Sequence, residues 1–284
     1  MKEKEFNLIK EQWIIVMDFS GKTREVSVEE LFGSAHEIKS LSGELPTQDI
    51  AVMRMLLAIL HAIFARYDKD GEYVPIESPD DAFKRWQGIW EEKKFPLKII
   101  DEYLVHFSDK FWLFHPCFPF YQVAAIKERK TTEYQSKKLN GMISESENKI
   151  RLFSSRSGNN KNQLSYPEAA RWLLHLNSFD DTSSKPQGKN LPTPGAGWLG
   201  KLGLISAEGD NLFETLMLNL VLLKNPGEIW GEEKPLWERE IVKESERTEI
   251  AIPDNPSELL TLQSRRILLK RDGNLVVGYR LLGG

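Results

Sequence analysis

Apolar and polar residues near the N-terminus follow the short period of β-strands and then the longer period of a helix. Residues 13–16 and 26–28 are rich in β-branched side chains and flank a turn containing Gly21, which predicts a β-hairpin. Ser27 stands three residues before Glu30, the spacing of a helical capping box. We therefore expect a hairpin that leads directly into a short helix.

Apolar positions then recur at helical spacing from residue 50 to residue 64, just after Pro46, and predict a central buried helix. The most apolar segment, residues 50–65, is interrupted by Arg54 and His61, and we expect it to be too short to cross a bilayer. His61 lies among apolar neighbours and is expected to be a hydrogen-bonded core histidine rather than a ligand. No membrane span is predicted.

The rest of the chain alternates apolar segments with polar loops. We expect amphipathic helices at residues 80–90, 166–179 and 211–223, a helix or strand at 259–269, and a hairpin turn at 272–274. Pro116 and Pro119 break the aromatic run of residues 103–121, so buried packing is favoured over base stacking. These elements predict an α+β fold, a helix-rich single large domain over residues 1–284 with small antiparallel sheets and long mobile loops.

Charge is distributed unevenly along the chain. The formal net charge is −4, which argues against general affinity for nucleic acid. Residues 127–161, however, hold nine Lys and Arg against four Glu, whereas residues 206–262 hold thirteen acids against five bases. Such asymmetry suits a protein that contacts phosphate with one surface, and it equally fits solvated loops in which charges cluster by chance.

Residues that could carry catalysis or bind a metal are sparse. Cys117 is the single cysteine, so no intramolecular disulfide can form and a cysteine-based zinc site is not expected. The five histidines match no zinc-hydrolase spacing. The glycines of residues 195–200 come close to a dinucleotide motif, but Pro192 and Pro194 occupy the place of the preceding strand. The sequence therefore predicts no cofactor and no metal.

Two loops carry the remaining candidate chemistry. Residues 188–201 are rich in glycine, contain Lys189 and Lys201, and have no acid, which fits a backbone laid against phosphates or a minor groove. Residues 149–156 interleave Lys and Arg with one phenylalanine, as contacts to single-stranded RNA often do. Either loop could equally be a surface connector. Residues 263–266 form a further basic patch or an exposed strand edge.

Six segments, in this order, resemble landmarks of the CasA family, the large subunit of the type I-E CRISPR surveillance complex Cascade. They are residues 6–57, 111–122, 194–200, 211–220, 235–238 and 263–266. The resemblance implies a non-catalytic subunit at the 5′ handle of the CRISPR RNA, beside the backbone subunits. It further implies that the subunit reads the protospacer-adjacent motif (PAM) of double-stranded target DNA, helps to open the duplex and recruits an effector nuclease-helicase.

The resemblance also assigns residues to these contacts. The PAM and DNA-binding loop matches Gly188, Lys189, Asn190, Gly195, Gly197, Gly200 and Lys201, and the loop that docks on the RNA handle and its subunits matches Arg151, Phe153, Arg156, Asn159 and Lys161. Gln263, Arg265 and Arg266 form the basic patch. We expect the chain to correspond to the N-terminal domain of the family, without its C-terminal helical bundle.

Two alternatives from other classes stay open. One is a small cytosolic hydrolase that uses His106, His115 and Cys117, although an orienting third group for such a couple is not evident in the sequence. The other is a protein-only scaffold whose basic loops bind acidic partner surfaces. The N-terminus has no apolar signal segment, so a cytoplasmic protein is expected in each case.

Overall fold

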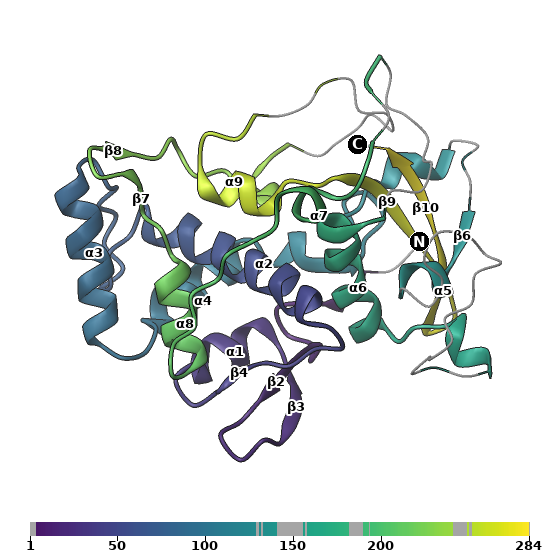
Figure 1. Ribbon diagram of the computed structural model, residues 1–284, viewed down its shortest axis with the longest axis horizontal. Coiled ribbons are helices and arrows are strands. Elements are labelled where there is room, and N and C mark those ends of the chain that lie inside the picture. Colours follow the sequence, from purple (N-terminus) through teal and green to yellow (C-terminus); the bar gives the residue numbers. More distant parts are fainter. Residues whose placement is uncertain are drawn as a thin grey trace.

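The chain is built around one long helix, α2 (Pro46–Phe64), which lies at the centre of the molecule (Figure 1). The computed structural model describes residues 4–128, 131, 133–140, 156, 158–181, 190–192, 194–240, 249 and 252–283. Nearly every side chain of α2 is buried, including those of Arg54 and His61. Helices α4, α6, α8 and α9 pack along it, so the predicted central helix is confirmed.

Helices surround α2 on several sides. They are α1 (Val28–Ser34), α3 (Pro79–Glu91), α4 (Leu97–His106), α5 (Ser136–Leu139), α6 (Tyr166–Phe179), α7 (Trp198–Leu202), α8 (Leu212–Asn219) and α9 (Pro256–Thr261), with 3-10 turns η1 (Ser108–Phe111), η2 (Ala124–Glu128), η3 (Gly158–Lys161) and η4 (Leu236–Glu238). The capping boxes of α1 and α6 are both formed, by Ser27 with Glu30 and by Ser165 with Glu168.

The strands form small antiparallel sheets. They are β1 (Glu5–Asn7), β2 (Ile14–Met17), β3 (Thr23–Val26), β4 (Ser40–Leu41), β5 (Trp112–Phe114), β6 (Glu133–Gln135), β7 (Leu223–Asn225), β8 (Glu228–Ile229), β9 (Arg265–Asp272) and β10 (Leu275–Gly283). Within the described residues they pair as β1-β5, β3-β2-β4, β6-β10-β9 and β7-β8. Figure 1 shows the β6-β10-β9 sheet at one end of the molecule and α3 at the other. The α+β class is confirmed.

Three expectations about these elements need correction. By length and composition α2 could cross a membrane, so the expectation that this stretch is too short was wrong; most of the helix is buried inside the fold, and Pro46 and Thr47 at its start are exposed. The amphipathic helix expected over residues 211–223 ends at Asn219, and the chain continues into β7. Residues 259–269 contain both the end of α9 and the start of β9.

The aromatic run is buried as predicted. Phe111, Phe114 and Phe120 belong to the main core. The ring centroids of Phe111 and Phe120 stack at 5.1 Å, and Phe111 also contacts Trp237 at 5.0 Å. These rings therefore serve packing, and the loops expected to be mobile fall largely outside the described residues.

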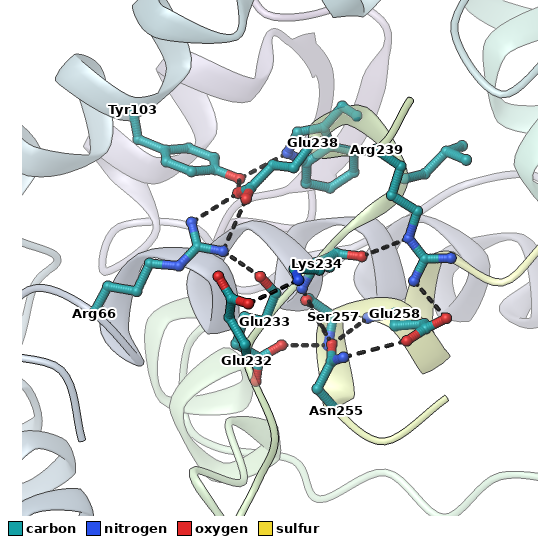
Figure 2. A network of polar contacts seen from close by, with 12 residues as sticks. Arg66, Tyr103, Glu232, Glu233, Lys234, Glu238, Arg239, Asn255, Ser257 and Glu258 are labelled. Atoms are coloured by element: carbon teal, nitrogen blue, oxygen red, sulfur yellow. Dashed lines mark hydrogen bonds and ion pairs between the residues drawn. The ribbon is translucent and has the colours of Figure 1, made fainter. Parts of the chain in front are cut away.

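A network of polar contacts fixes residues 232–239 against the helices (Figure 2). The Glu238 carboxylate pairs with Arg66 at 2.8 Å and accepts a hydrogen bond from the Tyr103 hydroxyl at 2.6 Å. Glu233 accepts from the backbone N–H of Ser257 at 2.8 Å, in the first turn of α9. His61 departs from expectation, because its buried Nδ1 has no hydrogen-bond partner within the described residues and lies 3.8 Å from Glu233 Oε1.

Candidate nucleic-acid interface

The glycine segment, defined here as residues 190–192 and 194–203, contains the described part of the predicted DNA-binding loop. Its helix α7 buries Leu199 and leaves Lys201 exposed. Gly203 follows with a φ of 70°, a left-handed conformation that glycine adopts without steric cost. Asn190 also has a positive φ, of 61°. Gly188 and Lys189 lie outside the described residues.

A buried ion pair holds the base of the glycine segment. Arg265, at the start of β9, donates from Nε to the Asp180 carboxylate at 2.5 Å and from its guanidinium to the Gly195 carbonyl. The Arg265 and Asp180 side chains are 2% and 3% exposed, respectively. The Asp180 carbonyl accepts from the backbone N–H of Gly197 at 2.9 Å. A charge-assisted contact of this kind fixes geometry strongly, so we call this set the Arg265 latch.

Close approach explains the glycine at position 197. A Cβ there would lie 2.5 Å from the Ser178 carbonyl oxygen and 2.8 Å from the Asp180 nitrogen. At Gly195 it would lie 3.0 Å from the Lys201 Nζ, because that side chain reaches back over the segment. A Cβ at Gly200 would meet only Ala196, at an ordinary 3.5 Å. The segment is thus pressed against the end of α6 with Lys201 beside it.

The basic patch at residues 263–266 is not the exposed surface that the sequence suggested. Arg265 is 1% exposed and Gln263 is 7% exposed, while Arg266 is only half-buried. The reason is the pairing of Arg265 with Asp180, a residue 85 positions away at the end of α6. The charge of Arg265 therefore positions the chain, and this part of the prediction was wrong.

The described part of the RNA-docking loop is anchored by ion pairs. Arg156 lies 3.0 Å from the Glu44 carboxylate and 2.8 Å from that of Glu168, with its side chain 12% exposed. Glu44 also accepts from the indole N–H of Trp172 at 3.0 Å. Burial alone would raise the pKa of Glu168, but hydrogen bonds from Ser165 and the Arg156 charge hold it below its usual value.

The other residues of this loop divide between described and undescribed positions. Arg151 and Phe153 lie outside the described residues. Asn159 and Lys161 belong to η3, and the Lys161 carbonyl accepts from Asn140 Nδ2 at 3.2 Å. The sequence did not indicate either carboxylate partner of Arg156. Glu44 is 112 positions away, and the capping-box spacing of Glu168 with Ser165 predicts a helix start but no ion pair.

The hydrolase alternative gains no support from the geometry. His115 Nδ1 accepts from the backbone N–H groups of Cys117 and Phe118, both at 3.1 Å, and so closes a turn. Burial lowers the pKa of His115 from its usual value, which keeps the ring neutral in that role. Among the described residues, no cluster of three or more His, Cys, Asp or Glu could hold a metal.

Comparison with known proteins identifies the family. The model of the CRISPR-associated protein Cse1 family matches residues 7–282. The chain belongs to the Cse1 family. CRISPR-associated protein CasA/Cse1 of Thermus thermophilus is 32% identical over 240 residues, which are 83% of this chain and 42% of the relative. The name of this relative, CasA/Cse1, gives CasA and Cse1 as one family, so the resemblance to the CasA family is confirmed.

Solved structures support the same conclusion. Thermobifida fusca Cse1 matches with a TM-score of 0.78 at 30% identity, covering 99% of this chain and 52% of that one. A chain of a CRISPR RNA-guided surveillance complex, pre-nicking, has a TM-score of 0.76 at 19% identity over 99% of this chain and 55% of its own length, and therefore shares the fold. The chain spans about half the length of the Cse1 relatives that it matches.

Proposed function

We propose that this Cse1-family chain is a non-catalytic, target-recognition part of a CRISPR RNA-guided surveillance complex in the cytoplasm. The observation that carries the proposal is the family match across residues 7–282. In the proposed complex the chain contacts the 5′ handle of the CRISPR RNA and the backbone subunits, binds double-stranded target DNA at the PAM, assists duplex opening and recruits the effector nuclease-helicase.

The glycine segment is the proposed contact with the PAM duplex. Glycines allow the backbone to approach the floor of a groove, and Lys201 stands beside Gly195 to meet a phosphate. The Arg265 latch supports this role because it holds the Gly195 carbonyl and the Gly197 N–H in place before DNA arrives. Readout from the minor groove is coarse and depends on shape, so a fixed backbone is more useful there than many side chains.

The proposed docking loop would contact the RNA handle through residues near Arg151 and Phe153. Arg156 contributes as an anchor, since its charge is already shared between Glu44 and Glu168. The loop is thereby attached to the start of α6 and to the turn before α2. Among the described residues of this loop, we assign the contact with phosphate to Lys161.

The proposal is tested by replacing Lys189 and Lys201 together with alanine in the reconstituted complex. Each phosphate contact contributes a slope of about −0.9 to log K against log salt on duplex DNA. Loss of two contacts should weaken binding of a PAM duplex and make that slope shallower by about 1.8. The measurement is a salt titration of duplex binding.

A matched variant, Lys84→Ala with Lys98→Ala, removes two exposed lysines from α3 and α4 and should change neither quantity. An unchanged salt slope in the Lys189 and Lys201 variant would remove the glycine segment from the DNA contact. If nuclease treatment releases no subunit from the purified complex, a protein-only scaffold is favoured instead.

A further inference from the structure

A basic groove lies between the turn of residues 114–119 and the β6-β10-β9 sheet. Its volume is about 630 Å³, within the range of ordinary ligand sites. Four cationic side chains line it, from η2, β9 and β10: Lys127, Lys270, Arg271 and Arg280. We call it the sheet groove. None of its lining residues belongs to the glycine segment, the RNA-docking loop or residues 263–266.

Carboxylates in and beside the sheet groove are outnumbered by cations. Glu133 is the acid among its lining residues, and it is shared by Lys270 at 2.8 Å and Arg280 at 2.7 Å. Hydrogen bonds from these two cations hold the pKa of Glu133 below its usual value. Arg271 pairs with Glu5, outside the lining set. The described lining residues thus hold one acid, Glu133, and four cations.

The cations are held in a fixed arrangement by the backbone. Arg280 donates from Nη1 to the Lys127 carbonyl at 2.8 Å, which ties η2 to β10. The main chains of β9 and β10 are paired without interruption from Arg265 with Gly283 to Lys270 with Gly278, and this part of the ladder carries both Lys270 and Arg280. An anion entering the groove would meet positive charges that are already in position, which lowers the entropy cost of binding.

Flat rings lie among these charges. The Arg271 guanidinium lies over the Phe114 ring, 4.8 Å from its centroid. His115 lines the groove and is stacked on Phe118 with a centroid separation of 3.6 Å. Phe114 is buried, so its ring holds Arg271 in place, whereas the His115 ring at the groove can accept a base. A cationic track beside such a ring fits single-stranded nucleic acid, because phosphates follow the charge and a base stacks on the ring. An acidic peptide would use the cations and leave the rings unused.

We propose that the sheet groove binds a segment of single-stranded nucleic acid. Lys127, Lys270 and Arg280 contact its phosphates, and the His115 ring supports a base. This site requires neither a PAM nor the glycine segment, so it goes beyond the proposed function and can fail or succeed independently of it. The overall charge of −4 disfavours general attraction to nucleic acid, which leaves the groove as a localised contact.

The test is fluorescence anisotropy of a labelled oligo(dT) of about 15 nucleotides, a length near the upper end of single-strand site sizes. Oligo(U) of the same length is the second arm, and each is titrated with the full chain over a range of salt. For single strands each phosphate contact gives a slope of about −0.7 in log K against log salt. Lys127→Ala with Lys270→Ala should weaken binding roughly 5- to 30-fold and make the slope shallower by about 1.4. The pair Lys84→Ala and Lys98→Ala, on α3 and α4, is the matched control and should bind within about twofold of the parent protein.

A variant that is expected to tighten binding distinguishes an effect on the groove from a general loss of folding. Glu133→Gln removes the acid from the lining set, and we expect it to bind oligo(dT) roughly 3- to 10-fold more tightly with a steeper salt slope, since it frees Lys270 and Arg280 for phosphate. Equal affinity for the two oligonucleotides would indicate contact with phosphates, and tighter binding of oligo(U) would add a contact to the 2′-hydroxyl; either result supports the groove. The proposal is overturned by unchanged binding in both variants, or by a polyglutamate peptide of equal charge that displaces oligo(dT) at the same concentration.

Discussion

Glu233 has the most strongly altered titration of any described carboxyl group near the core helix. Burial raises its pKa to about 7, and the hydrogen bond from Ser257 opposes this only in part. Its neighbour His61 is shifted the other way, because burial lowers the pKa of that imidazole to about 3. Burial disfavours the charged form of both groups, so the pair is most stable when each is neutral.

The raised pKa of Glu233 makes stability depend on pH. The unfolded carboxyl titrates near 4.5 and the folded one near 7, so the folded state binds the extra proton between these values. Its contribution to stability is fully present below pH 4.5 and is lost as the pH rises through 7. Complete loss amounts to roughly 3 kcal/mol as an upper bound. Glu233→Gln should remove this dependence and leave a flatter curve between about pH 5 and pH 8.5, as measured by urea denaturation.

His61 must be separated from this effect, because its sign is opposite. Its lowered pKa makes the unfolded state bind more protons below pH 6.5, so His61 reduces stability as the pH falls toward 3. The difference between the parent protein and Glu233→Gln isolates the carboxyl group. Parallel curves for the two proteins over the same pH range would show that Glu233 titrates normally.

The glycine segment offers a matched pair of substitutions at the level of elements. Gly197→Ala would place a methyl group 2.5 Å from the Ser178 carbonyl oxygen, so the segment must move off the end of α6. We expect a loss of about 1–3 kcal/mol in the free energy of unfolding. Gly200 lies inside α7, where an added methyl group would make only an ordinary contact with Ala196. Gly200→Ala should therefore raise the free energy of unfolding by up to about 1 kcal/mol. Chemical denaturation compares them, and equal effects would contradict the close approach at position 197.

Local elements were predictable because their signals are local. Ser27 and Glu30 stand three residues apart and cap α1 as expected, and the turn at residues 272–274 joins β9 to β10. The end of α8 was missed because the apolar run continues past Asn219 into β7, and periodicity alone does not separate a buried helix from a short strand.

The contacts that hold the candidate site were not predictable, because they join distant residues. Asp180 follows an amphipathic helix and Arg265 is the first residue of a strand, and nothing in either segment specifies the other. The same holds for Arg156, whose pairing with Glu44 turns an expected RNA contact into an anchor. The sheet groove was missed for a related reason. Its cations come from η2, β9 and β10, and η2 is far in the sequence from the β9-β10 hairpin beside which it lies in the fold.

Charge on the whole molecule is less segregated than the sequence suggested. The acid-rich residues 206–262 direct several carboxylates inward: Glu233, Glu238 and Glu258 have side chains 2%, 12% and 16% exposed. These acids make contacts that hold residues 232–239 and α9 together (Figure 2), so they contribute little to the electrostatic potential at the surface of the molecule. The accessible basic surface in the described residues includes Lys201 and the sheet groove, in agreement with a negatively charged partner.

On the whole-molecule scale, we propose that this Cse1-family chain recognises a PAM duplex as part of a surveillance complex. The most direct measurement is a mobility-shift titration of PAM-bearing and PAM-altered duplexes with a complex that lacks its large subunit. The chain is added alone and, separately, joined to the C-terminal half of a relative such as Thermobifida fusca Cse1. We predict that the joined protein restores binding with at least a roughly tenfold preference for the PAM duplex, a difference of about 1.4 kcal/mol. Failure of both additions to restore PAM-dependent binding would show that the chain does not recognise the PAM duplex.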